Sequence, residues 1–393
     1  MKIYITGIGA ISGIGINAKE NFLSVSRNKN GMGKVSLFPT ILDVPVSEVK
    51  YTNSQLKEIL SLPSEKTFSR TALLGMLAAK EALEDAGIHV HSQRTGFISS
   101  TSVGGMDLSE NFYPDYKNNP NSGKLRNIIS HDCGDSTERI ASYLGITDYI
   151  TTISTACSSA ANAIMLGARM IKNGLLDAVI VGGTDALCKF TLNGFNSLMI
   201  LDNEHCRPFD QSHTGLNLGE GAGYLVLQSE KSLRKKAYST LSGYANSNDA
   251  YHQTATSPDG NGPYLCMKES LEVAGISPSE IDYISVHGTG TQNNDESEGK
   301  AMVRLFGDKV PPFSSLKPFI GHTLAASGGI EAVFSVMAIN SGVLNPNLNF
   351  RTPMEGINLY PITAYQENVQ IKHVLSNSFG FGGNDTSLVF SAL

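Results

Sequence analysis

The chain has 393 residues, of which 41% are hydrophobic and 17% are charged, so it is long enough for one large or two medium domains. Its net charge is −6 and it has no basic block, which argues against binding to nucleic acid or to an anionic membrane. Five irregularly spaced cysteines without a CxxC pair predict neither a disulfide framework nor a zinc site. No run approaches the roughly 18 apolar residues of a membrane helix, and we expect a cytoplasmic protein.

Strands and helices alternate along the first half of the chain. The opening "KIYITGIG" predicts a strand and a glycine turn rather than the apolar core of a signal peptide. Residues 69–88 predict a helix, because their apolar residues recur at helical spacing and Gly87 ends the run. Strands are predicted at 94–99 and at 177–187, the latter apolar enough to be buried on both faces. Residues 106–135 interrupt this alternation and predict a long loop or a short irregular helix pair.

The second half of the chain resembles the first. Residues 149–171 predict a strand, a polar turn and a helix of small residues, and residues 310–337 repeat that order. This self-similarity predicts a duplicated α/β unit, with the break in the charged segment "SEKSLRKKAYS". We predict an N-terminal half, residues 1–235, that carries a cysteine nucleophile, and a C-terminal half, residues 236–393, that carries two histidines.

Cys157 lies where the first of these strands becomes a helix. A free cysteine is most often a buried small hydrophobic residue. Here, however, its neighbours Thr155, Ser158 and Ser159 are polar, and the predicted helix begins at or just after it. The free N–H groups and partial positive charge of a helix N-terminus stabilise a thiolate and lower the pKa of the thiol. The pattern therefore predicts an activated nucleophile on a rigid element.

Two of the nine histidines also lie at the ends of strands. His287 ends the strand "DYISV" and begins "HGTGT", and His322 lies in the glycine turn "FIGHT" ahead of a helix of small residues. Open α/β sheets place their sites at such strand ends. Lys317 precedes His322 in an apolar stretch, and Glu331 follows it inside an apolar helix, where a lone carboxylate is costly unless it is paired. Each residue alone is compatible with a structural role, but the shared context indicates one site.

Four motifs along the chain together identify a family. "TACSSAANAI", "VHGTGT", "LKPFIGHTLAASGGIEAV" and "NSFGFGG" follow one another in the order found in the β-ketoacyl-acyl carrier protein synthases, the elongating condensing enzymes of the thiolase superfamily. The chain resembles this family over nearly its whole length. The resemblance implies an α/β fold of two thiolase-like halves in a layered α-β-α-β-α arrangement.

The resemblance also implies a role for each residue of the predicted site. Cys157 would accept the acyl chain from an acyl carrier protein. His287 and His322 would bind and decarboxylate the malonyl thioester and stabilise its enolate. Lys317 would support His322, and Glu331 would belong to the surrounding buried polar network. The physical chemistry agrees, because a nearby ammonium group disfavours a second positive charge and two neutral imidazoles donate hydrogen bonds to a developing oxyanion.

Further roles concern the substrate arm and its carrier. Thr289 and Thr291 would hydrogen-bond the phosphopantetheine arm. The backbone N–H groups of Cys157 and Phe381 would form an oxyanion hole, with Phe381 gating the pocket. The family needs no metal and no cofactor beyond the phosphopantetheine of the acyl carrier protein, and it implies a homodimer or, alternatively, a heterodimer with a chain-length-factor-like subunit. Carrier proteins are acidic, so Lys66 and Arg70 are candidate docking residues.

The chain departs from the family pattern in two motifs. Gln292 follows "HGTGT" where the family usually has proline, and Asn384–Asp385 stand where threonine–asparagine is common. These departures leave the substrate open between a housekeeping fatty-acid enzyme and a specialised polyene, aryl-lipid or polyketide synthase.

Three other protein classes match parts of the pattern. A dinucleotide-binding dehydrogenase is disfavoured because Ser12 replaces the third glycine of GxGxxG. A thiolase would carry a second cysteine in the C-terminal glycine-rich loop, which has none here. A non-catalytic chain-length-factor-like partner would lack the nucleophile, which Cys157 supplies.

Overall fold

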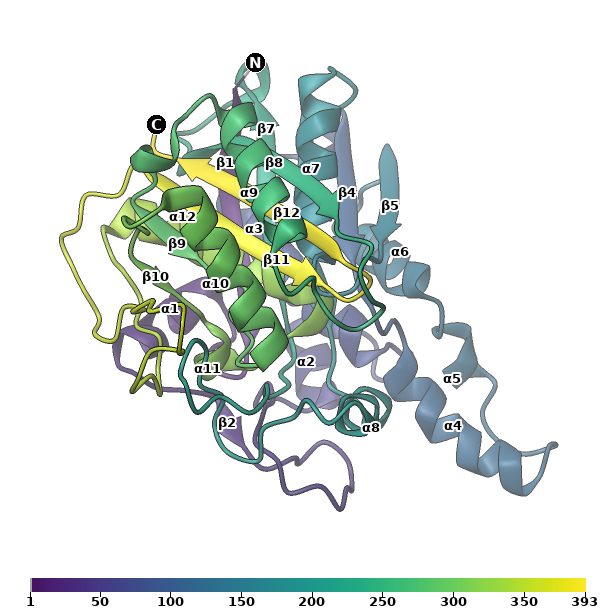
Figure 1. Cartoon of the computed structure of the whole chain (residues 1–393). Coiled ribbons are helices and arrows are strands. Elements are labelled where there is room, and N and C mark those ends of the chain that lie inside the picture. The colour runs from purple at the N-terminus through teal and green to yellow at the C-terminus, as the bar shows by residue number, and fades with distance from the viewer. Residues whose placement is uncertain (1) are drawn as a thin grey trace.

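A computed structural model describes residues 2–393 and contains one ten-stranded mixed sheet (Figure 1). A two-stranded ribbon, β2 and β3, lies beside it. The strands are β1 (Ile3–Ser12), β2 (Met32–Gly33), β3 (Val46–Ser47), β4 (Thr95–Ser100), β5 (Tyr149–Ile153), β6 (Ala178–Asp185), β7 (Gly221–Ser229), β8 (Ser239–Asn248), β9 (Tyr283–Ser285), β10 (Phe313–Ser314), β11 (His373–Gly380) and β12 (Asn384–Ser391).

Twelve α-helices, named within the described residues, accompany these strands. They are α1 (Ala18–Ser26), α2 (Asn53–Ile59), α3 (Arg70–Ala86), α4 (Met106–Asn118), α5 (Arg126–Ile129), α6 (Cys133–Leu144), α7 (Ser159–Lys172), α8 (Lys189–Ser197), α9 (Asn261–Ala274), α10 (Gln292–Phe306), α11 (Lys317–Ile320) and α12 (Ser327–Ser341).

The strand order confirms the predicted duplication. From the centre outward, the first half runs β1-β7-β6-β4-β5 and the second runs β8-β12-β11-β9-β10. In each half the two outer pairings are parallel and the two inner pairings are antiparallel. The halves join where β1 pairs with β8, so both belong to one sheet. The division into residues 1–235 and 236–393 stays a prediction.

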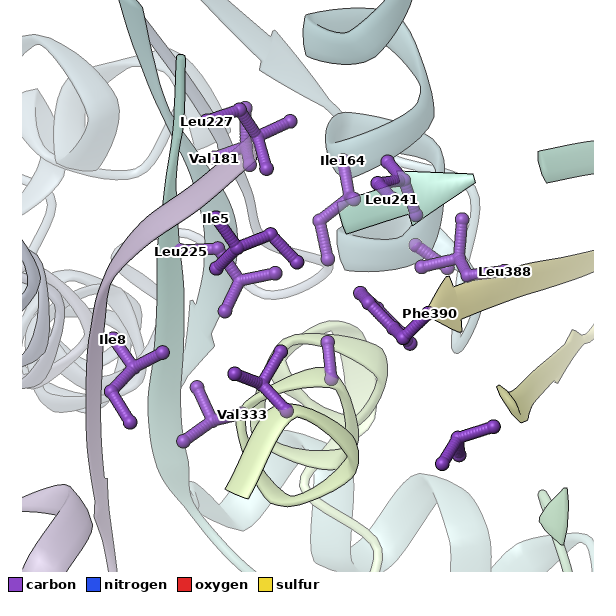
Figure 2. Close-up of a cluster of buried hydrophobic side chains, with 14 of the residues drawn as sticks. Ile5, Ile8, Ile164, Val181, Leu225, Leu227, Leu241, Val333, Leu388 and Phe390 are labelled. Carbon is purple, nitrogen blue, oxygen red and sulfur yellow. The ribbon is translucent and has the colours of Figure 1, made fainter. Parts of the chain in front are cut away.

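Helices cover and separate the two halves of the sheet, which confirms the five-layer α-β-α-β-α arrangement. Helices α3 and α6 pack on the outer face of the first half, and α9, with α10 against it, covers the second. Helices α7 and α12 lie between the halves and contact both. Figure 2 shows the apolar core of this middle layer, where Ile164 of α7 and Val333 of α12 meet strand residues from both halves.

Small residues let the two central helices approach each other and the sheet. A Cβ added to Gly328 would lie 3.2 Å from the Cβ of Ala161 on α7, and one added to Gly329 would lie 2.4 Å from the carbonyl oxygen of Gly223 on β7. Both distances are shorter than ordinary contacts, so these positions of α12 require glycine. The small residues after Cys157 and His322 therefore bring the starts of α7 and α12 close together.

Two local predictions can be compared with the structure. The helix predicted at 69–88 is confirmed as α3, which begins after the N-cap Ser69 and ends at Gly87 with φ of 63°. The segment 106–135 forms α4, α5 and the beginning of α6 rather than a loop, and Pro114 lies inside α4.

One prediction about apolar runs is wrong. The helical segment Leu324–Ser341 is, by its 18-residue length and its composition, apolar enough to cross a membrane. It is 78% buried inside the protein, however, where it includes the central helix α12. Its apolar character follows from contact with sheet on two sides, because a helix between two layers has no solvent-facing stripe.

Candidate active site

Cys157 lies in a tight turn between β5 and α7. Ala156 has φ of 52°, an unusual value for a residue with a side chain. The N–H of Thr155 donates a hydrogen bond to Ser159 Oγ at 2.8 Å. Because Ser159 is the first residue of α7, this bond holds the turn against the start of the helix. Such a conformation costs about 1–3 kcal/mol and persists because the surrounding structure holds it. The turn presents the thiol at the beginning of the central helix.

The structure brings His287 and His322 to this thiol from the second half of the chain. His322 Nε2 lies 3.0 Å from Cys157 Sγ. The two imidazole rings are 5.3 Å apart at their centroids and nearly perpendicular, at 84°. All three side chains are at least nine-tenths buried. The three residues singled out from the sequence therefore form one cluster.

Lys317 contacts His287 rather than His322, although its charge also lowers the pKa of His322 as the prediction requires. Its Nζ atom lies 3.3 Å from His287 Nδ1, donates to the His287 carbonyl oxygen, and lies 2.7 Å from Glu331 Oε1. The side chains of Lys317 and Glu331 are 1% and 2% exposed, so they form a buried ion pair. An ammonium group only donates hydrogen bonds, so His287 Nδ1 accepts and its proton resides on Nε2.

Burial, more than any charge, sets the protonation of the cluster. It lowers the pKa of both His287 and His322 well below the ordinary value, and the positive charge of Lys317 lowers them further. Burial also raises the pKa of Cys157 to about 11, although the backbone N–H of Phe381 and the charge of Lys317 act in the opposite direction. The expectation of a lowered thiol pKa at the helix start is therefore wrong for the resting protein. The thiol and both imidazoles are neutral at pH 7.

Hydroxyl groups orient the second imidazole. Ser327 Oγ lies 2.9 Å from His322 Nδ1 and 3.2 Å from Thr323 Oγ1. A Ser327 hydroxyl that donates to Nδ1 leaves the His322 proton on Nε2, facing Cys157. Ser327 begins α12, and because serines are frequent at helix starts, no local pattern indicated this contact.

The loop after β11 closes the other side of the thiol. Backbone N–H groups of Phe381 and of Cys157 itself both stabilise a negative charge at the sulfur. The Phe381 ring stacks on Phe195 of α8, with centroids 5.8 Å apart and planes at 17°. Phe379 packs against His287 at 5.9 Å. The oxyanion and gating roles implied by the resemblance stay predictions.

An entrance pocket of about 490 Å³ leads to the cluster. Thr289 and Thr291 line it, and their Oγ1 atoms lie 2.8 Å apart. Thr254 and Thr256 line the same pocket from the loop that follows β8. The pocket is thus a hydroxyl-rich channel that ends at the thiol and the two imidazoles.

Two residues that the sequence did not assign to the site hold it together. Asn384 Oδ1 accepts hydrogen bonds from Ser158 Oγ and Asn162 Nδ2, both at 2.7 Å, which ties the start of α7 to β12. Glu298 accepts the N–H groups of His287 and Gly288, both at 2.9 Å. These contacts join segments far apart in the chain, so local pattern could not reveal them.

Asp385, the second departure from the family pattern, is buried without a hydrogen bond. It is 0% exposed, and neither side-chain oxygen has a partner among the described residues. Asp249 and Asp385 both lie against Gly262, and Asp249 and Glu298 repel a charge at Asp385. Burial and these two carboxylates raise the pKa of Asp385 to about 9. Asp385 is therefore protonated at neutral pH.

The Cys157, His287 and His322 ligand atoms lie within 4.8 Å of one another, which also meets the distance requirement of a metal site. The neighbouring charge argues against one. Lys317 repels a cation, and its hydrogen bond to His287 Nδ1 leaves Nε2 as a donor rather than a ligand. The donor set suits a developing anion better than a metal ion.

Arg70, a predicted docking residue, proves to be internal. It is 3% exposed, and its Nη2 atom lies 2.6 Å from Oε1 of the fully buried Glu220. The prediction is wrong for Arg70, because the sequence could not distinguish a buried ion pair from a solvated helix start. Lys66 is exposed and stays a prediction.

Comparison with known families decides the classification. Residues 1–232 match the profile described as "Beta-ketoacyl synthase, N-terminal domain", and residues 238–351 match "Beta-ketoacyl synthase, C-terminal domain". The chain belongs to the β-ketoacyl synthase family. This membership excludes the dehydrogenase and thiolase alternatives and confirms the resemblance seen in the four motifs.

Full-length relatives support the assignment. The "3-oxoacyl-[acyl-carrier-protein] synthase 2" of Staphylococcus aureus (strain MRSA252) is 30% identical over 410 residues, covering 99% of this chain and 98% of that protein. The solved structure "The ishigamide ketosynthase/chain length factor" has a TM-score of 0.94 at 27% identity and covers 100% and 99% of the two chains. The ketosynthase–chain length factor complex of ApeO and ApeC from Xenorhabdus doucetiae has a TM-score of 0.86 at 31% identity, covering 100% and 98%.

Proposed function

We propose that this protein is a β-ketoacyl-acyl carrier protein synthase, an acyltransferase that extends an acyl chain held on Cys157 by two carbons from a malonyl thioester. The observation that carries the proposal is the 3.0 Å contact between Cys157 Sγ and His322 Nε2, with His287 beside it in the same pocket. The 30% identity to a full-length 3-oxoacyl-[acyl-carrier-protein] synthase supports the same reaction.

The first step transfers the acyl group from the carrier arm to Cys157. A carbon–sulfur bond forms at Cys157 Sγ, and the bond between the acyl carbon and the carrier sulfur breaks. The thiol proton passes to the departing carrier thiolate, and the Nε2–H of His322 donates a hydrogen bond to the Cys157 sulfur as it loses that proton. The N–H groups of Cys157 and Phe381 stabilise the oxyanion that forms at the acyl oxygen. The raised pKa of the resting thiol makes this proton transfer part of the step.

The second step releases CO₂ from the malonyl thioester. The bond between the carboxylate carbon and the α-carbon breaks, and its electron pair produces an enolate. His287 and His322, each neutral with a proton on Nε2, donate to the enolate oxygen in a site closed to bulk water. Burial, reinforced by the charge of Lys317, keeps both imidazoles neutral, and Lys317 holds His287 Nδ1 as an acceptor.

The last step forms the new carbon–carbon bond. The enolate carbon attacks the acyl carbon on Cys157, the carbon–sulfur bond to the enzyme breaks, and the Cys157 thiolate takes up a proton from solvent. The β-ketoacyl product leaves on the carrier arm, two carbons longer. Atoms and charge balance with the carrier-bound substrates and one proton from solvent, so the mechanism calls for no metal and no further cofactor.

The partners follow from the chemistry of the entrance pocket. Thr289 and Thr291 suit a role as hydrogen-bond partners of the phosphopantetheine arm, and an acyl carrier protein would deliver it. We propose a dimer, either of two copies or with a chain-length-factor-like subunit, as in the complex of ApeO and ApeC. A cytoplasmic location fits five free cysteines, four of them buried.

The choice between primary and specialised metabolism depends only on which acyl chain the protein extends. The high structural similarity to the ishigamide ketosynthase supports a specialised product, whereas the curated relatives support fatty-acid chains. A non-catalytic partner subunit is the second candidate, but the complete Cys157, His287 and His322 cluster argues against it.

A condensation assay tests the proposal. The protein is incubated with acyl- and malonyl-carrier proteins, and CO₂ release and the β-ketoacyl product are followed together. We expect stoichiometric CO₂ and a product two carbons longer, and neither the product nor the acyl-enzyme in a Cys157→Ala variant. A Cys157→Ala protein that still elongates would overturn the proposed function.

A further inference from the structure

Besides the entrance pocket, one cavity borders Cys157 and a second cavity borders the first along α8. The near cavity, about 340 Å³, is lined by Cys157 itself together with Val103, Leu324 and Phe381. The far cavity, about 970 Å³, lies among α4, α5 and α8 and has an aromatic wall that includes Phe112. Figure 1 shows α4 and α5 extending from the body of the protein next to α8.

The two cavities border the same face of α8. Phe190, Gly194 and Ser197 line both of them and follow one another at helical spacing. A chain attached to Cys157 that fills the near cavity therefore meets this stripe of α8 before it reaches the far cavity. Gly194 occupies the middle of the stripe.

Nothing in the local structure requires glycine at position 194. The residue lies inside α8 and has no positive φ. A Cβ added there would find no atom within 4 Å. A glycine inside a helix costs about 1 kcal/mol relative to alanine. Backbone geometry explains Gly87 and close packing explains Gly328, but neither explains Gly194. What the missing side chain provides is open space where the cavities meet.

We propose that Gly194 is a specificity-determining residue that keeps open the passage of long apolar acyl chains from the near cavity into the far cavity. The inference rests on the proposed function, because the acyl chain must be attached to Cys157. Short acyl groups end inside the near cavity and do not pass Gly194. Long chains pass Gly194 and bury their ends against the aromatic side chains of α4, gaining hydrophobic contact in proportion to the area buried.

A Gly194→Leu substitution tests this passage. Wild-type protein and variant are incubated separately with butyryl- and palmitoyl-carrier protein, and the rate of acyl transfer to Cys157 is followed by intact mass. We expect butyryl transfer to be unchanged and palmitoyl transfer to fall by about tenfold or more. Gly194→Ala should produce a smaller loss in the same direction. Asn196→Leu, an exposed position on the same helix that lines neither cavity, is the matched control and should transfer both chains like the wild type.

The outcomes separate this inference from the proposed function. If the wild type transfers neither acyl group, the proposed function fails. If the wild type transfers both and Gly194→Leu also transfers both at wild-type rates, only the role of Gly194 is wrong. Equal losses for butyryl and palmitoyl groups would likewise contradict a length-dependent passage. Should Gly194→Leu not fold, as judged by circular dichroism, Gly194→Ala must show the selective loss of palmitoyl transfer or the inference is refuted.

Discussion

Replacing Asp385 by asparagine should stabilise the protein, and increasingly so as pH rises. Asp385 is fully buried beside Asp249 with no hydrogen bond to either of its oxygens. An asparagine has nearly the same shape, cannot ionise, and offers N–H donors to the neighbouring carboxylates. The substitution therefore removes a desolvated acid and adds hydrogen bonds without changing the packing.

The magnitude follows from the shifted pKa of Asp385. Its value in the folded protein is about 9, whereas an unfolded aspartate has a pKa of about 3.9. The folded state therefore binds one proton more than the unfolded state between these values, so stability contributed by the neutral form is present below pH 4 and is lost as pH rises toward 9. Each pH unit above the unfolded pKa lowers the free energy of unfolding by about 1.4 kcal/mol. The loss at pH 7 therefore has an upper limit on the order of 4 kcal/mol.

Thermal unfolding of wild type and Asp385→Asn between pH 5.5 and pH 8.5 measures this effect. We expect the variant to unfold at the higher temperature throughout, with a difference that widens as pH rises. Asp308→Asn removes one exposed carboxylate and is the matched control, for which we expect no such widening. A difference that stays constant with pH, or an Asp385→Asn protein that is less stable than the wild type, would refute the reasoning about Asp385.

Three further substitutions test the buried charges and the imidazoles. His287→Ala should leave acyl transfer to Cys157 intact and slow condensation by about 10²–10³-fold, measured by CO₂ release; equal loss of both steps would contradict its role at the enolate. Lys317→Met should lower the free energy of unfolding in urea by about 3–5 kcal/mol, because it leaves a buried carboxylate unpaired, and adding Glu331→Gln should recover part of that loss. Arg70→Met should lower the free energy of unfolding by a similar amount, because it leaves the Glu220 carboxylate unpaired. An unchanged free energy of unfolding would contradict the buried ion pair.

Local sequence signals predicted the parts of the protein that local physics determines. Ser69 and Gly87 delimit α3 in the structure as in the sequence, because capping depends on residues within one helical turn. The repeated strand–turn–helix order predicted the duplicated halves. It also brought Cys157 and His322 into matching positions, and the structure places them in contact.

The errors concern burial and long-range contacts. The charge of Lys317 acts on His322 as the sequence predicted, but the direct contact is with His287, 30 residues away along the chain, which no local pattern indicated. Arg70 was interpreted as a solvated residue and is internal, because its partner Glu220 lies 150 residues away. The pKa of Cys157 was expected to fall at a helix start, but burial, which no local pattern reports, outweighs the helix.

The most direct test of the central claim is the intact mass of the protein after incubation with an acyl-carrier protein, followed by peptide mapping of the adduct. We predict a single acyl adduct on Cys157, its disappearance when malonyl-carrier protein is added, and a β-ketoacyl product two carbons longer in its place. An adduct on another residue, or condensation without any adduct on Cys157, would contradict the proposed mechanism.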